Sequence, residues 1–212
     1  IFSPDNYEQI AYAYIEGLER LAAHGAPPAA PASVASFFVS RVDTAVDRLL
    51  EALLKETPDP GEQARIRGLL GQAAIANAKV AYQRFKQIFG QERFLSLRRQ
   101  GARVQRPLWA STSTKNPAYR DVVYVEELIG PDTVNTMPPA TLAAFRDHGT
   151  VRASLEENVE HACQVFDQLA ECGIDMERIY ADLQTAGIRA FAESFEGVLS
   201  CIRERQVELR RA

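Results

Sequence analysis

Most of the chain carries apolar residues at the three- and four-residue spacing of an amphipathic helix. The first such stretch follows Ser3 and Pro4, a capping residue and a proline that together begin a helix, and it stops near Gly25. Farther along, Ser154 is expected to cap a helix, with Glu157 completing a capping box. The spacing predicts helices over residues 3–25, 45–55, 62–89, 91–100, 141–148, 154–172, 175–187 and 188–212.

Short apolar runs between these helices predict β-strands. The clearest run covers residues 33–39, and shorter ones cover 107–111 and 133–137. Ile1 and Phe2 resemble the tail of a further strand, whereas residues 121–129 fit a helix or a strand equally well. Strands separated by helices are typical of βαβ units and a parallel sheet. A closed α/β barrel needs eight strands, so we expect an α/β chain that forms part of a barrel.

The segment PLWASTSTKNPAY, residues 107–119, places polar groups directly after a predicted strand. Hydroxyl residues 111–114 come first, and Lys115, Asn116 and the expected helix start at Pro117 follow. Hydroxyls, a cation and a helix N-terminus at the carboxyl edge of a sheet are groups that hold a phosphate. An ordinary polar loop between a strand and a helix is the alternative.

Arg41 follows the predicted strand 33–39 in a similar position. An arginine just beyond a strand end can bind phosphate with its planar, bidentate guanidinium group. The alternative is a surface ion pair between Arg41 and Asp43 or Asp47.

Composition narrows the classes of function. The 212 residues have a net charge of −4 and 46% hydrophobic residues, values that suit one globular domain. No apolar run reaches the length of a membrane span, and the charge pattern lacks the basic stripe of a nucleic-acid-binding protein. The three cysteines suit reduced thiols of a cytoplasmic protein, and the three histidines lack metal-ligand spacing, so we expect no metal site.

A lysine-based mechanism has few candidates in this chain. The only lysines are Lys55, Lys79, Lys86 and Lys115. Lys79 lies inside the alanine-rich part of the predicted helix 62–89, where we expect its side chain to be exposed or to extend towards water.

Several segments in the same order resemble the transaldolases: SVASFFVSRVDT, AIANAKVAYQ, RPLWASTSTKNPAY and DTVNTMPPATLAAFRDHG. The resemblance is to the long bacterial form, found alone or fused to phosphoglucose isomerase. It implies a (β/α)8 TIM barrel of the class I aldolase type, with residues 1–212 as the C-terminal portion of one barrel domain. The opening residues IFSPDNYEQI are similar to the end of the fifth barrel strand, so the chain would cover about strands 5–8 plus extra C-terminal helices.

The resemblance also implies an activity. Transaldolases of the pentose phosphate pathway transfer a dihydroxyacetone unit between sugar phosphates through a lysine Schiff base, in the cytoplasm and without a metal or organic cofactor. The implied substrates are fructose 6-phosphate, sedoheptulose 7-phosphate, erythrose 4-phosphate and glyceraldehyde 3-phosphate. Carried onto this chain, Arg41, Ser111 and Lys115 would bind substrate phosphate, whereas Ser36, Phe38 and Asn116 would line the pocket.

The family's Schiff-base lysine lies on strand four, and its acid/base carboxylates lie on strands one and three. Because the chain starts at about strand five, we expect that lysine upstream of Ile1 and no catalytic residue in this chain. A missing N-terminal half, either a separate chain or residues not represented here, would then be a partner, and the 212 residues alone would be inactive. Two alternatives remain: a non-catalytic helical interaction module of transaldolase ancestry, and a transaldolase–isomerase fusion.

Overall fold

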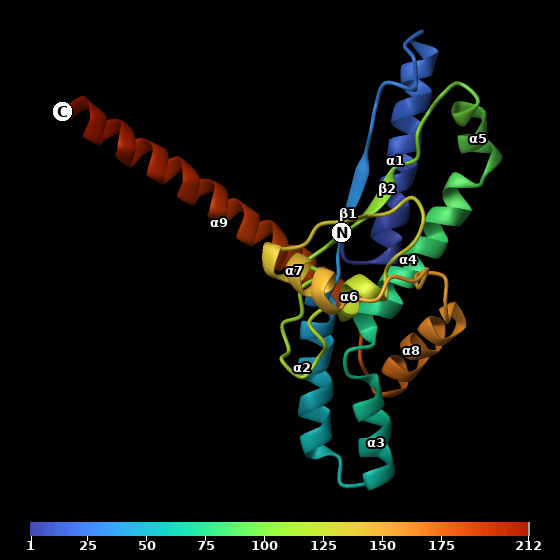
Figure 1. Ribbon diagram of the computed structural model, residues 1–212, viewed down its shortest axis with the longest axis vertical. Coiled ribbons are helices and arrows are strands. Elements are labelled where there is room, and N and C mark those ends of the chain that lie inside the picture. The colour runs from blue at the N-terminus through green and yellow to red at the C-terminus, as the bar shows by residue number, and fades with distance from the viewer. Residues whose placement is uncertain (212) are drawn as a thin grey trace.

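The computed structural model describes residues 1–211, which form nine helices and three strands (Figure 1). The strands are β1 (Val34–Phe38), β2 (Arg106–Ala110) and β3 (Val134–Asn135). The helices are α1 (Pro4–Ala23), α2 (Ser40–Glu56), α3 (Pro60–Leu69), α4 (Ala73–Phe89), α5 (Glu92–Arg98), α6 (Val123–Glu126), α7 (Pro139–His148), α8 (Val159–Glu171) and α9 (Met176–Arg211). The predicted α/β class is confirmed in this coarse form, with helix predominating.

The described strands form one parallel sheet in the order β1-β2-β3. The register pairs Phe38 with Ala110, so the carboxyl ends of β1 and β2 lie at the same edge. Ile1 runs beside β1, where its amino group donates to the carbonyl of Ser36 and its carbonyl accepts from the amide of Phe38, each at 3.0 Å. These two bonds follow a parallel ladder, so Ile1 behaves as the expected strand tail although no strand is assigned there.

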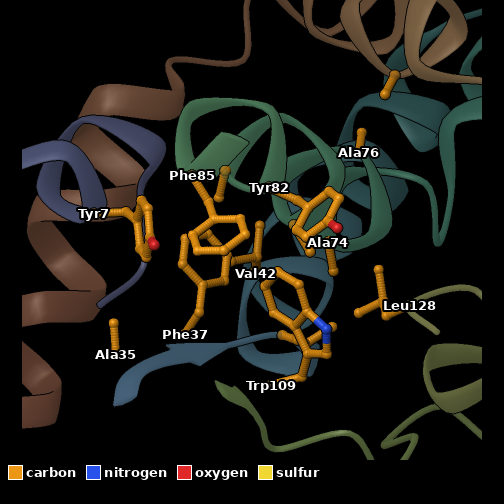
Figure 2. Packing of buried hydrophobic residues seen from close by; sticks show 14 of the residues in the cluster. Tyr7, Ala35, Phe37, Val42, Ala74, Ala76, Tyr82, Phe85, Trp109 and Leu128 are labelled. Atoms are coloured by element: carbon orange, nitrogen blue, oxygen red, sulfur yellow. The ribbon is translucent and has the colours of Figure 1, made fainter. Parts of the chain in front are cut away.

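One face of the sheet is covered by helices. Phe37 and Trp109 point into this side, are fully buried, and meet edge to face with ring centroids 5.8 Å apart. They belong to the same buried cluster as Ala74, Tyr82 and Phe85 of α4 (Figure 2). The small alanines of α4 allow this helix to pack closely, as its composition predicts.

The opposite face of the sheet is more open. Because side chains alternate along a strand, Val34, Ser36 and Phe38 point away from the helix-covered side. Val34 and Ser36 are exposed. Phe38 is half-buried, as is Leu108, which pairs with Ser36 across the sheet. An α/β sheet is ordinarily covered on both faces, so this face is unusually accessible in the described residues.

The helix α2 begins at Ser40, earlier than the predicted start at Ala45. Only Val39 separates β1 from Ser40. The amide of Ser40 donates to the carbonyl of Ser111 at 3.0 Å, so the contact between the ends of β1 and β2 continues into the first residue of α2. Asp43 in the first turn also favours an early start, since a carboxylate there complements the positive end of the helix.

The single helix predicted over residues 62–89 is wrong: the structure has two helices, α3 and α4, separated at Gly71. Gly71 has a φ of +71°, which glycine adopts readily and other residues do not. Its amide donates to a carboxylate oxygen of Asp47 at 3.0 Å. In a continuous helix this amide would instead donate to a backbone carbonyl one turn earlier. A side chain at Gly71 would also lie 2.8 Å from the ring of Tyr119.

The segment after β2 also differs from prediction. Pro117 does not start a helix, and residues 111–122 are irregular up to the short helix α6, which resolves the ambiguous stretch 121–129. Ser154 does not cap a helix. Its hydroxyl is buried, donates to the carbonyl of Glu126 and accepts from the amide of Ile129, while α8 starts later, at Val159.

The two helices predicted over 175–187 and 188–212 form one helix, α9, of 36 residues. The predicted start at residue 175 is confirmed, and Asp175 caps it by accepting a hydrogen bond from the amide of Arg178. Gly187 does not end α9 because glycine stops a helix only where the chain turns left-handed. The C-terminal part of α9 extends away from the rest of the molecule (Figure 1). The predicted end of this helix at Ala212 lies outside the described residues.

Candidate functional site

Arg41 lies in the first turn of α2, immediately beyond the carboxyl end of β1. Its side chain is exposed, and its guanidinium carbon lies 5.2 Å from the centroid of the Phe38 ring. A guanidinium over an aromatic face is held in place while its N–H groups remain available. Within the described residues Arg41 has no ion pair, so the alternative of an ion pair with Asp43 or Asp47 is wrong.

Ser111 joins the ends of β1 and β2. Its hydroxyl lies 2.9 Å from the hydroxyl of Ser40, and its carbonyl accepts from the amide of Ser40 at 3.0 Å. Ser111 has a φ of +58°, an uncommon conformation for a serine, at the point where the chain leaves the sheet. These contacts hold Ser111 next to the start of α2 and therefore close to Arg41 in the fold.

Arg41 and Lys115 line one cavity of about 920 Å³ between α2 and the start of α9. Lys115 is exposed and its ammonium donates to the hydroxyl of Ser113 at 2.8 Å. Other charged residues that line the cavity are Arg48, Asp175, Arg178 and Asp182. Several cations around a concave surface attract an anion more strongly than a single exposed cation does.

The remaining predicted site residues are spread around this cavity. Phe38 lines a neighbouring cavity of about 380 Å³ together with Arg41. Asn116 lines another of about 320 Å³ together with Lys115, and Ser36 lies on the open face of β1. Ser36, Ser111 and Asn116 are not among the described residues that line the 920 Å³ cavity. Of the predicted site residues, only Arg41 and Lys115 are among the described residues that line the 920 Å³ cavity.

Asp43 and Asp47, next to this region, are buried, which the sequence patterns did not predict. Asp43 on α2 accepts hydrogen bonds from the hydroxyl of Tyr124 and the amide of Ala74, both at 2.7 Å. Burial raises the pKa of Asp43 to about 7, although the hydrogen bonds from Tyr124 and Ala74 oppose that rise. A buried acid that faces two hydrogen-bond donors is a structural anchor rather than a surface charge.

Asp47 lies one helical turn beyond Asp43 and binds two further groups. Its carboxylate accepts from the hydroxyl of Tyr119 at 2.7 Å and from the amide of Gly71 at 3.0 Å. Burial raises the pKa of Asp47, and burial together with the neighbouring carboxylate raises that of Tyr119. The sequence contained one signal: Asp43, Val46, Asp47 and Leu50 share a helical face, so two acids lie on a side that α2 buries.

No lysine of the chain lies at a strand end in the described residues. Lys55 and Lys86 lie on helices, and Lys115 lies in the irregular segment after β2. The expectation of an exposed Lys79 side chain is wrong, because Lys79 is buried. Its ammonium donates to the carbonyl of Glu157 at 2.9 Å. This ammonium also lies 3.6 Å from the carboxylate of Glu127. A buried lysine whose ammonium is bound by a carbonyl and a carboxylate has a structural role.

Residues 1–211 contain no group of three or more histidine, cysteine or acidic side chains arranged to hold a metal ion. Among the same residues, no helix combines the length and apolarity needed to cross a membrane.

A family model and individual related proteins point to the same family. The model of the transaldolase/fructose-6-phosphate aldolase family matches residues 1–202. A transaldolase of Trichodesmium erythraeum is 44% identical over 211 residues, which cover 99% of this chain and 56% of that protein. A transaldolase of Saccharopolyspora erythraea is 45% identical over 205 residues, covering 96% of this chain and 53% of that protein. The chain thus spans about half the length of these relatives, and it belongs to the transaldolase/fructose-6-phosphate aldolase family.

Proposed function

We propose that this chain supplies the phosphate-binding side of a transaldolase active site. The observation that carries the proposal is the shared cavity of Arg41 and Lys115, two cations from successive strand-to-helix connections at the carboxyl edge of a parallel sheet. In α/β barrels the active site lies at this edge. The hydroxyl of Ser111 would add a third group near the phosphate, and Ser36 and Phe38 would face the sugar from β1.

The reaction would be the transfer of a dihydroxyacetone unit between sugar phosphates of the pentose phosphate pathway, in the cytoplasm. A lysine Schiff base provides an iminium carbon that accepts electrons when the neighbouring carbon–carbon bond breaks. We place this lysine outside the 212 residues, because Lys55, Lys79, Lys86 and Lys115 lie away from the described strand ends. In this proposal the chain acquires activity only when the lysine-bearing part joins it.

The same proposal assigns places in a (β/α)8 barrel. Ile1 would be the end of strand five, and β1, β2 and β3 would be strands six, seven and eight. Their order and parallel direction support this assignment, as does the open face that carries Ser36. A closed barrel would place that face in its interior, against the remaining strands. The alternative of a non-catalytic helical interaction module gains no support from the comparisons.

Substitution of Arg41 tests the phosphate role. In the protein expressed from its complete gene, Arg41→Ala should weaken binding of fructose 6-phosphate by roughly 1.5–3 kcal/mol, the range for hydrogen bonds to charged groups. Isothermal calorimetry with fructose 6-phosphate, and with fructose as the ligand without phosphate, measures the effect. Arg67→Ala is the matched control, since Arg67 lies exposed on α3 and contacts Gln63. Unchanged affinity in Arg41→Ala would remove the basis of the proposal.

A further inference from the structure

The segment between β2 and α6, residues 111–122, carries Lys115 but has no helix or strand to position it. At its start, Ser111 bonds to Ser40, and the buried hydroxyl of Thr112 donates to the side chain of Asn135 at 2.8 Å. Within the described residues, the side chain of Lys115 forms one hydrogen bond, to the hydroxyl of Ser113 two residues earlier. The position of Lys115 therefore depends on how the far end of this segment is held.

The far end is held by α2, the helix that also carries Arg41. The hydroxyl of Tyr119 donates to Asp47 at 2.7 Å, and that of Tyr124, just beyond the segment, donates to Asp43 at the same distance. Two tyrosines thus tie the segment that bears Lys115 to two successive turns of one helix. Arg41, the other proposed phosphate-binding residue, lies in the first turn of that helix.

These contacts are shielded from water. Asp43, Asp47 and Tyr124 are buried and Tyr119 is half-buried. The ring of Tyr119 covers Gly71, where even a methyl group would lie 2.8 Å from its nearest ring atom. Hydrogen bonds in such surroundings are stronger than exposed ones and fix a geometry more rigidly. The network is thus suited to setting the separation between Lys115 and Arg41.

We propose that Tyr119 and Asp47, supported by Tyr124 and Asp43, are positioning residues that hold Lys115 opposite Arg41 for phosphate binding. This inference rests on the proposed function of the cavity. Tyr119 and Asp47 touch no substrate and act through Lys115. Loss of the Tyr119 hydroxyl should therefore weaken phosphate binding without changing the chemistry of the bound sugar.

Tyr119→Phe removes the hydroxyl and keeps the ring over Gly71. In the protein expressed from its complete gene, the dissociation constant for inorganic phosphate should rise roughly 2- to 10-fold, as for the loss of one hydrogen bond. KM for fructose 6-phosphate should rise similarly while kcat stays within about twofold, because binding that is equal in ground and transition states affects KM alone. Tyr14→Phe is the matched control: it removes a 2.9 Å hydrogen bond to the carbonyl of Arg103, on the segment that precedes β2.

A double-mutant cycle separates positioning from general stability. If Tyr119 acts through Lys115, Tyr119→Phe should have little further effect on phosphate affinity in a Lys115→Gln background. Additive effects would overturn the inference, as would a lowered melting temperature with unchanged phosphate affinity. Asp47→Asn, which leaves one carbonyl oxygen for both Gly71 and Tyr119, is a second variant and should shift affinity in the same direction.

Arg41→Ala, measured in the same phosphate titration, keeps the two proposals distinguishable. If Arg41→Ala weakens phosphate binding and Tyr119→Phe does not, the positioning role is refuted and the phosphate site stands. If Arg41→Ala has no effect, the proposed function itself fails.

Discussion

Asp43 shows how a single residue in this chain departs from the role its type suggests. An acid two residues from an exposed arginine suggests a surface ion pair. Asp43 is instead buried against Tyr124 and Ala74, which leaves Arg41 free of acidic partners in the described residues. An arginine without a carboxylate partner can give its N–H groups to a ligand. The burial of Asp43 therefore bears on the phosphate site as well as on the core.

The raised pKa of Asp43 gives a prediction for the pH dependence of stability. Its pKa of about 7 in the folded state exceeds the unfolded value of 3.8, so the folded state binds more protons between these values. The contribution of Asp43 to stability is then largest at low pH and is lost as the pH rises through about 7. Asp43→Asn should remove this dependence.

Urea unfolding at several pH values from 5 to 8 measures this effect. We expect the free energy of unfolding of the parent protein to fall relative to that of Asp43→Asn as the pH rises. A constant difference between the two proteins would show that Asp43 is already ionised at pH 5.

At the scale of elements, helical periodicity located most helices, but contacts distant in sequence decided their ends. The cap at Ser3 and the strand at 33–39 follow from local signals, and the structure has both. The break at Gly71 depends on Asp47 and Tyr119, which lie far from Gly71 in sequence. Periodicity alone continues through such a break, because Leu69, Leu70 and Ala73 keep the helical spacing.

In the candidate site, too, some residues could be predicted from local sequence signals and others depend on contacts distant in sequence. Arg41 and Lys115 could be found from the sequence because each follows a recognisable strand, and both line the shared cavity. Tyr119 and Asp47 could not, because their pairing arises only when the segment 111–122 folds back onto α2. A tyrosine in a polar segment gives no local sign of the acid that it will contact.

The two glycines Gly71 and Gly187 should respond oppositely to alanine. Gly71→Ala should destabilise the protein, since Gly71 has φ +71° and a methyl group there meets the ring of Tyr119 at 2.8 Å. Gly187→Ala should stabilise it by about 0.5–1 kcal/mol, because alanine is the better helix former and its methyl group would contact Phe2 at an ordinary 3.5 Å. Thermal unfolding of both variants checks this, and a destabilised Gly187→Ala would argue against a continuous α9.

At the scale of the whole molecule, large apolar surfaces remain uncovered in the described residues. They include Val34 on the open face of the sheet. They also include Ile188, Phe191, Phe195, Val198 and Ile202 on α9, which are exposed by 57–66%. Exposed patches of this kind usually mark surfaces that meet further protein. Together with relatives about twice as long, they support the proposal that this chain works as one part of a larger transaldolase.

Borohydride trapping shows directly which lysine forms the Schiff base. The protein expressed from its complete gene would be incubated with fructose 6-phosphate, reduced and mapped by peptide mass spectrometry. We expect a three-carbon adduct on a lysine outside these 212 residues, with Lys55, Lys79, Lys86 and Lys115 unmodified. An adduct on any of these lysines, or no adduct at all, would contradict the proposal that this chain is the phosphate-binding side of a Schiff-base transaldolase.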